Sequence, residues 1–196
     1  MKTIGFFGGT FDPIHFGHLF LALQLAEAKG LDEVWICPAF CSPFKQNRQP
    51  LASAEHRLEM VRLATEEIPN FKVISTEVEK EKISYTIDTL RALSPARCHL
   101  LLSEESASQF MKWKEPEEIA RIAHPLIGCR EISQHLDSQK DDWKNIPFLK
   151  AGLVLTKRME ISSTEIRERL KNKLYCGHLV PAKALDYIQR HRLYSC

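Results

Sequence analysis

Short runs of apolar residues recur along the chain and are typical of strands buried on both faces of a sheet. These runs cover residues 2–7, 33–38, 71–75, 98–102, 125–129 and 153–156. Between and after them, apolar positions follow a helical spacing over residues 19–28, 54–67, 87–93, 116–122, 164–171 and 182–191. Strands that alternate with helices predict an α/β fold, in which a doubly wound, mainly parallel sheet carries helices on both faces.

The length of the chain and its polar stretches predict a single domain with three surface loops. A chain of 196 residues buries about 70% of the surface that its unfolded form exposes, which is enough for one α/β core. We therefore expect one domain over residues 1–196. Polar stretches at residues 41–50, 77–82 and 133–145 predict the loops, and we expect the charged residues 79–82 to be solvated.

The charge balance excludes several kinds of partner. The net charge is only +2, from 27 basic and 25 acidic residues. The chain therefore lacks the excess of positive charge that is typical of proteins that bind nucleic acid or an anionic membrane. No apolar run approaches the roughly 18 residues of a membrane helix, and the first residues lack the pattern of a signal peptide. We therefore expect a cytoplasmic protein. The six cysteines contain no C-x-x-C pair, which favours buried free thiols.

The string GGTFDPIHFGH follows the first predicted strand and has the composition of a phosphate-binding turn. Gly8 and Gly9 allow a polyphosphate to approach the backbone, and Thr10 adds a hydroxyl. His15 and His18 are three residues apart, which puts both imidazoles on one side of a helical turn. Other interpretations are a simple tight turn, a histidine helix cap, or a zinc site, for which no further ligands stand at a recognisable spacing. We predict no protein-held metal here.

A second motif, ISSTEIR, opens a C-terminal helical part at about residues 160–196. The letters SSTE fit a capping box, with Ser162 as the N-cap and Glu165 reaching back, so we expect a helix to begin near Ser163. The free amides of this helix end would attract a second anion, and Arg167, one turn further on, would add a fork of donors. The alternative is that the serines only cap the helix and that Arg167 is solvated.

Both motifs resemble those of the nucleotidylyltransferase superfamily, in which H-x-G-H follows the first strand. The full first string is similar to the bacterial nicotinate (nicotinamide) mononucleotide adenylyltransferase branch. PFK at residues 43–45, SYTIDTL at residues 84–90 and ISSTEIR at residues 161–167 also match, so the resemblance covers nearly the full chain. It implies a Rossmann-like fold and transfer of the adenylyl group of ATP to nicotinate mononucleotide. The products would be nicotinate adenine dinucleotide and pyrophosphate, in NAD biosynthesis.

The resemblance also implies which residues form the site. The catalytic residues would be Thr10, His15, His18 and Arg167. The ATP-binding residues would be Gly8, Gly9, Thr10, Phe11, His18, Lys45, Glu105, Arg130, Ile161, Ser162, Ser163, Thr164 and Arg167. The acceptor nucleotide would contact His15, Tyr85, Thr86 and Trp113, with the indole near the pyridine ring.

The implied reaction requires two anions to be aligned while charge grows at the α-phosphate of ATP. We expect His18 to donate to the α-phosphate oxygens, and Lys45 and Arg167 to hold the outer phosphates. Mg²⁺ would arrive with ATP and bridge its phosphates, because this ion typically keeps water ligands and uses few carboxylates. Asp12 would either reach the ion through water or bond turn amides. A homo-oligomer is compatible with the sequence.

Three departures from the family pattern keep other hypotheses open. SEE at residues 103–105 stands where the family usually has a Gly-x-Asp turn. Glu105 therefore replaces the acid near the adenosine ribose, and Ser103 replaces a glycine that would allow close approach or a positive φ. Phe44 stands where histidine is common, and EIS after Arg130 replaces a glycine- and aromatic-bearing loop. The alternatives are another nucleotidylyltransferase, such as one that acts on phosphopantetheine, or a nucleotide-binding relative that has lost catalysis.

Overall fold

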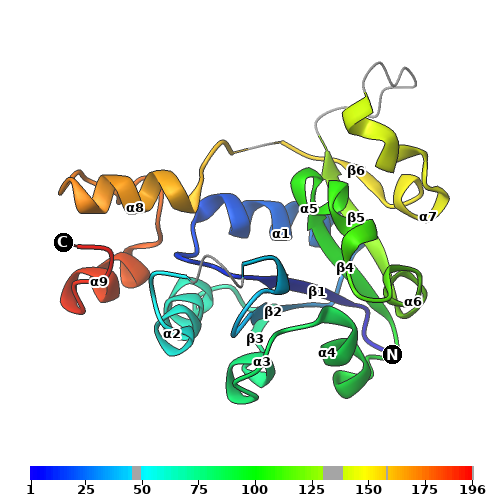
Figure 1. Cartoon of the computed structure of the whole chain (residues 1–196), viewed down its shortest axis with the longest axis horizontal. Helices are drawn as coiled ribbons and strands as arrows, with labels where there is room; N and C mark the ends of the chain where they lie inside the picture. The colour runs from blue at the N-terminus through cyan, green and yellow to red at the C-terminus, as the bar shows by residue number, and fades with distance from the viewer. Residues whose placement is uncertain (46–49, 130–138, 158, 196) are drawn as a thin grey trace. The chain divides into compact units, whose positions relative to one another are not determined.

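A computed structural model describes residues 1–45, 50–129, 139–157 and 159–195. Within this part, six strands form one sheet in the order β3-β2-β1-β4-β5-β6 (Figure 1). The strands are β1 (Ile4–Gly9), β2 (Glu33–Pro38), β3 (Phe71–Val73), β4 (Cys98–Ser103), β5 (Ala123–Cys129) and β6 (Leu153–Leu155). β4 pairs in parallel with β1 and with β5, and β5 pairs in parallel with β6.

The strand order reverses between β1 and β4. The chain begins in the middle of the sheet, moves outward through β2 and β3, and returns to place β4 beside β1. Because crossovers between parallel strands are right-handed, the two halves carry their connecting helices on opposite faces. The predicted doubly wound α/β fold is therefore confirmed. In such sheets ligands bind beyond the carboxyl ends of the strands near the reversal. β1 extends two residues further than predicted and ends with Gly8 and Gly9, the first residues of the phosphate-binding motif.

The helices predicted from apolar spacing are all present. They are α1 (Phe16–Lys29), α2 (Ala54–Thr65), α4 (Thr86–Leu93), α6 (Pro116–Ile122), α8 (Ser163–Lys171) and α9 (Ala182–Arg190). The structure adds short helices that the sequence did not predict. These are α3 (Thr76–Glu79), α5 (Glu104–Ser108) and α7 (Pro147–Lys150), with the 3₁₀ segments η1 (Pro43–Lys45), η2 (Phe110–Lys112) and η3 (Gln139–Asn145). Segments of one or two turns are too short to show a helical period.

All three predicted surface loops contain a helical segment and a buried residue. In the first loop, which overlaps η1, the buried residue is Cys41. The second loop overlaps α3, where Glu77 is 6% exposed, although residues 79–82 are exposed as predicted. In the third loop, Trp143 lies in η3 and is 7% exposed. One buried side chain anchors such a segment to the core, and the average polarity of the run conceals it. Residues 46–49 and 130–138 lie outside the described part of the chain.

The contacts of the chain fall into two compact units. Unit 1 comprises Met1–Phe7, Leu21–Val34 and Thr86–Arg158. Unit 2 comprises Gly8–Phe20, Trp35–Tyr85 and Met159–Cys196. Both sequence motifs, the glycine-rich turn and ISSTEIR, belong to unit 2. The expectation of one domain stays a prediction.

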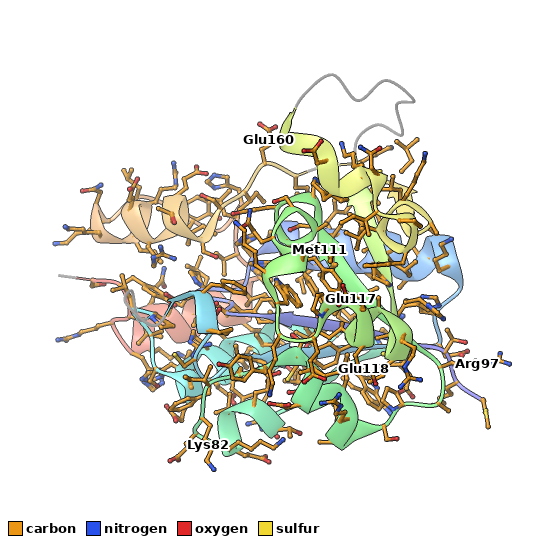
Figure 2. All side chains as sticks on the ribbon, turned by 45° about the vertical axis from the view of Figure 1, so that its right-hand side comes forward. Lys82, Arg97, Met111, Glu117, Glu118 and Glu160 are labelled. Carbon is orange, nitrogen blue, oxygen red and sulfur yellow. The ribbon has the colours of Figure 1, made fainter. Side chains whose placement is uncertain are left out.

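Unit 1 is closely packed at the first strand. A Cβ atom at Gly5 would lie 2.8 Å from Leu31 Cδ1 and 3.0 Å from Leu101 Cδ1, so any larger residue would displace these side chains. Acids in the first turn of α6 complement the positive end of that helix, and Figure 2 shows Glu118 among them. Glu118 pairs with Arg121 on the same helix at 2.6 Å.

Unit 2 is organised around α2, which packs against α9. Ala54 and Leu58 on α2 form a buried cluster with Val78, and Phe40 and Val73 pack against this cluster. Ser53 caps α2, because its side chain accepts a hydrogen bond from the amide of His56, the third residue of the helix, at 3.3 Å. The packed helix is therefore a firm support for the loops that precede it.

The cysteine prediction is confirmed where the structure describes the residues. The free and buried thiols are those of Cys37, Cys41, Cys98, Cys129 and Cys176. Burial raises the pKa of Cys98 to about 12, which keeps this thiol protonated and unreactive. Cys196 lies outside the described part. Among the helices that the structure describes, none is long and apolar enough to span a membrane.

Candidate functional site

The turn after β1 is shaped by Phe11. This residue has a left-handed backbone with φ 50°, and its ring is 3% exposed. A Cβ atom at Gly9 would lie 2.8 Å from the Phe11 ring, so only glycine leaves room for it. The ring also meets the His18 imidazole edge-on, with centroids 5.1 Å apart. Phe11 therefore supports the turn and one of the predicted catalytic residues.

His15 and His18 lie together at the start of α1, as the spacing predicts. The His18 amide donates to the His15 carbonyl at 3.0 Å, and the His15 amide donates to His18 Nδ1 at 3.3 Å. The two rings are stacked, with centroids 3.7 Å apart and planes inclined by 23°. Because Nδ1 of His18 accepts a hydrogen bond, the proton of the neutral ring is on Nε2. His18 therefore caps the helix, and its neutral ring carries its donor on Nε2.

His15 is the more buried of the two histidines. Its side chain is 5% exposed, and its Nδ1 atom has no hydrogen-bond partner among the described residues. Burial lowers the pKa of His15 to about 4, so the ring is neutral at pH 7. Gly17 makes room for it, since a Cβ atom there would lie 3.1 Å from His15 Nδ1.

The low pKa of His15 predicts a loss of stability in mild acid. An unfolded histidine takes up its proton near pH 6.5, whereas the folded ring resists protonation until about pH 4, so the unfolded state binds more protons in between. The contribution is complete above pH 6.5 and is lost as the pH falls towards 4, with a limit of roughly 3 kcal/mol. Urea unfolding at a series of pH values measures this effect.

The control for this prediction is His15→Phe, which keeps a ring against His18 and removes the titration. The free energy of unfolding of the unaltered chain should fall relative to that of the variant between pH 7 and pH 4.5. A difference between the two proteins that does not change with pH would contradict the assignment of a depressed pKa to His15.

Arg57 on α2 is an element of the site that sequence reasoning missed. It is 1% exposed, and its guanidinium donates to four backbone carbonyls at 2.6 to 3.2 Å. The acceptors are Thr10, Ala39, Phe40 and Ala52. Arg57 thereby ties the glycine-rich turn to the loop after β2 and to the start of α2. Burial lowers its pKa from the ordinary value. The sequence did contain a signal for this. Arg57 stands three residues after the buried Ala54, and residues at that spacing lie on the same side of a helix.

Asp12 is the second hub of the turn, and it is 7% exposed. Its carboxylate accepts hydrogen bonds from the amides of Leu51 at 2.9 Å and Ala52 at 3.1 Å. It also accepts one from the Tyr194 hydroxyl at 2.7 Å. The expectation that Asp12 bonds amides holds, but the amides come from the segment before α2 rather than from its own turn.

ISSTEIR forms the predicted helix start and returns to the first motif. Ser162 Oγ accepts from the Glu165 amide at 3.1 Å, which confirms the N-cap of α8. Ser163 Oγ donates to the Pro13 carbonyl at 2.9 Å. Arg167 Nη1 donates to the Asp12 carbonyl at 2.6 Å. The alternative in which the serines only cap and Arg167 is solvated is therefore wrong, and unit 2 brings the two motifs together.

The other predicted site residues in unit 2 differ in how far they are exposed. Gly8 is exposed, whereas Thr10, Tyr85 and Ile161 are half-buried. Thr164 Oγ1 accepts from Arg167 Nη2 at 3.0 Å. Glu160, labelled in Figure 2, is exposed and opens the segment that leads into α8. The Lys45 side chain and all of Arg130 lie outside the described part, so the structure says nothing about these two predictions.

Three predicted site residues that the structure describes belong to unit 1. Thr86 is the first residue of α4, and Glu105 is exposed in α5. Trp113 ends η2, where its half-buried indole lies against Phe110 with ring centroids 5.3 Å apart.

Ser103 does not have the backbone that a glycine would be needed for. Its φ is −79°, which any residue adopts, so the loss of the family's glycine here imposes no strain from a positive φ. Its hydroxyl caps α5 by accepting from the Ser106 amide at 3.2 Å. The serine thus replaces the flexibility of glycine with a helix cap.

Comparison with known proteins agrees with this arrangement of motifs. Residues 6–169 match the family described as cytidylyltransferase-like. Over 199 residues, the chain is 35% identical to the nicotinate-nucleotide adenylyltransferase of Bacillus subtilis, with 100% of both chains covered. The chain belongs to this adenylyltransferase family. A relative from Dictyoglomus thermophilum, named "Probable nicotinate-nucleotide adenylyltransferase", is 40% identical over 195 residues, covering 97% of this chain and 98% of the relative. Family membership makes the chain a nucleotidyltransferase.

Solved structures with this fold are also known. The nicotinic acid mononucleotide adenylyltransferase of Plasmodium falciparum, in a complex with NaAD, aligns with a TM-score of 0.73 and 19% identity. The alignment covers 99% of this chain and 98% of that one. At this identity, the likeness supports the fold of the adenylyltransferase family and not the details of its site.

Proposed function

We propose that the chain transfers the adenylyl group of ATP to nicotinate mononucleotide, in NAD biosynthesis. The observation that carries this proposal is the direct bond from Arg167 to the Asp12 carbonyl. It joins the H-x-G-H turn and ISSTEIR, the two most specific family motifs, in one unit. A phosphate oxygen of the acceptor attacks the α-phosphorus of ATP, and the bond from that phosphorus to the bridging oxygen of pyrophosphate breaks.

The residues of the turn are suited to stabilise the charge that develops in this step. We assign His18 as the donor to an α-phosphate oxygen, because its Nδ1 is held by the His15 amide and its proton is on Nε2. Gly8, Gly9 and Thr10 would admit the phosphates close to the backbone at the positive end of α1. His15 is neutral, so it supports the His18 ring without placing a charge beside it.

Arg167 is the proposed cation for the phosphates on the α8 side. A guanidinium has five N–H groups, more than the two bonds to Asp12 and Thr164 use. The backbone at Ile161, Ser162, Ser163 and Thr164 would add contacts at the capped start of α8. Lys45, Arg130 and Phe11 complete the proposed ATP set, with Glu105 at the ribose.

Mg²⁺ is proposed to enter as the ATP complex. The nearby carboxylate, Asp12, already accepts from two amides and one hydroxyl, so its lone pairs are directed at protein donors. In the described ranges, no group of three or more His, Cys, Asp or Glu side chains is arranged to hold a metal ion. The phosphates and water would then supply the ligands, as this ion prefers.

The acceptor side of the proposal rests on Tyr85, Thr86 and Trp113, together with His15. An indole face suits a pyridine ring, and backbone amides near these residues would select a carboxylate over an amide, which presents an N–H₂ group to the same donors. We place the reaction in the cytoplasm.

The test of the proposed function compares two acceptors. Pyrophosphate release from ATP and Mg²⁺ is measured with nicotinate mononucleotide and with nicotinamide mononucleotide at equal concentration. We expect kcat/KM to be at least about tenfold higher for the acid, because an amide would leave buried donors unpaired. Phosphopantetheine serves as the control acceptor. Release with phosphopantetheine alone, or ATP binding without release for any acceptor, would overturn the proposal.

A further inference from the structure

The end of the chain turns back sharply after α9, which is drawn in red in Figure 1. Arg192 has a left-handed backbone with φ 51°, and its amide donates to the Gln189 carbonyl at 3.1 Å. The next amide, that of Leu193, donates to the Ile188 carbonyl at 3.0 Å. These two bonds form a Schellman motif with arginine in the position that glycine usually takes. The motif reverses the chain direction just before Tyr194.

Tyr194 carries backbone strain of its own. Its φ is 62°, a left-handed conformation that is unfavourable for a bulky residue. Its hydroxyl donates to Asp12 Oδ1 at 2.7 Å, across 182 residues of sequence. Burial, and then the charge of Asp12, raise the pKa of Tyr194, so the phenol stays protonated and remains a donor. A strained residue whose polar atom is directed at a buried carboxylate indicates a constraint beyond packing.

The same aspartate orients Arg167. Arg167 Nη1 lies 2.6 Å from the Asp12 carbonyl oxygen and 3.9 Å from Asp12 Oδ2. The Asp12 carboxylate thus accepts from the Tyr194 hydroxyl, and the Asp12 backbone carbonyl accepts from the Arg167 guanidinium. Asp12 is buried, Tyr194 is half-buried, and the Arg167 side chain is 21% exposed. Arg167 is therefore the cation of this group that can meet a bound anion.

We propose that Tyr194 is a positioning residue of the ATP phosphate site, acting through Asp12 on Arg167. This proposal rests on the proposed function, because it assigns the phosphates of ATP as the anions that Arg167 holds. Tyr194 keeps the carboxylate in the orientation that fixes the turn and the guanidinium together. Without the hydroxyl, Asp12 Oδ1 keeps only the longer bond from the Ala52 amide at 3.1 Å. The less firmly held carboxylate reorients towards Arg167, and the guanidinium is drawn away from the bound nucleotide.

The variant Tyr194→Phe tests this proposal, because it removes the hydroxyl and retains the ring. We expect the KM for ATP to rise about fivefold. The variant loses one charge-assisted hydrogen bond, from Tyr194 to Asp12, which does not contact the nucleotide itself but acts through Arg167. The KM for nicotinate mononucleotide should change less than twofold. Titration calorimetry with a nonhydrolysable ATP analogue should show the same weakening in the absence of acceptor.

A matched control is available in the same unit. Tyr187 on α9 also has a bonded hydroxyl, 2.8 Å from His56 Nδ1, and Asp12 is not its partner in that bond. Tyr187→Phe should leave both KM values unchanged. A double variant separates positioning from packing: when Arg167→Ala has already removed the guanidinium, adding Tyr194→Phe should cause no further loss of ATP affinity. The melting temperature of each variant is recorded alongside.

The outcomes separate this proposal from the proposed function. Unchanged ATP affinity in Tyr194→Phe, or equal losses with and without Arg167, would overturn the positioning role while the adenylyl transfer stands. Weakened analogue binding in a chain that forms no product from nicotinate mononucleotide would support the positioning role and overturn the proposed function. No binding of the analogue by the unaltered chain would overturn both.

Discussion

Replacing His18 by alanine is expected to lower kcat for adenylyl transfer about 10² to 10³-fold, the range for removal of one donor to a transition-state oxyanion. The structure gives the reason, because His18 Nδ1 accepts from the His15 amide and the proton of the neutral ring is therefore on Nε2. The loss should appear in kcat more than in KM, since the donor acts where charge develops during the reaction. Steady-state pyrophosphate release measures it.

Two further substitutions separate donation from helix capping. The amide oxygen of His18→Asn stands close to the position of Nδ1 and keeps an acceptor for the His15 amide, but it provides no donor near Nε2. In His18→Gln, the side-chain amide reaches the position of Nε2, so it provides a donor there but no acceptor for the His15 amide. If donation carries the effect, the Asn variant should be as slow as the Ala variant, and the Gln variant should recover part of the rate.

The control is His56→Ala, which removes another bonded, half-buried histidine of unit 2 from α2. Its kcat should stay within about twofold of the original, because its hydrogen bond is to Tyr187, which is not a proposed site residue. A His18→Ala variant that transfers adenylyl groups at nearly the original rate would remove His18 from the mechanism. An Asn variant with full activity would show that the cap, and not the donor, is what matters.

The parts of this fold that the sequence predicts are those encoded locally. Ser162 was predicted as an N-cap because the capping box lies within four residues, and the structure shows the bond to the Glu165 amide. The strands were predicted because each is a short apolar run between turn signals. By contrast, Trp143 and Glu77 are buried inside polar runs, where only the tertiary structure reveals an anchor.

The same distinction applies to the candidate site. The stacking of His15 and His18 follows from a spacing of three residues on one helix. The bonds of Asp12 to Leu51 and to Tyr194 span 39 and 182 residues, and no local pattern specifies them. The left-handed backbone of Phe11 is likewise set by how its ring packs over Gly9. Family resemblance named the residues proposed to bind the ligands, whereas the residues that support them required coordinates.

Arg57→Met is expected to destabilise the chain by about 3 to 5 kcal/mol, the range for breaking a buried, hydrogen-bonded charge. The guanidinium donates to four backbone carbonyls, and a thioether cannot replace these donors. Backbone carbonyls cannot be substituted away, so they would remain buried with lost partners. For a chain of this length the melting temperature should fall by roughly 10 °C. The loss of stability in Arg57→Lys should be smaller than in Arg57→Met, because lysine keeps the charge but lacks the several donors of the planar guanidinium.

The matched control is Arg62→Met on the same helix. Arg62 is 53% exposed at its side chain and pairs with Glu59 at 3.4 Å, a surface contact worth about 0.5 kcal/mol or less. Urea unfolding of both variants at pH 7 compares a buried clamp with a solvated charge on one helical scaffold. Equal losses would mean that the four carbonyls find other partners when the guanidinium is removed. A large loss confined to Arg57 would mean that this side chain holds the glycine-rich turn, the loop after β2 and α2 together.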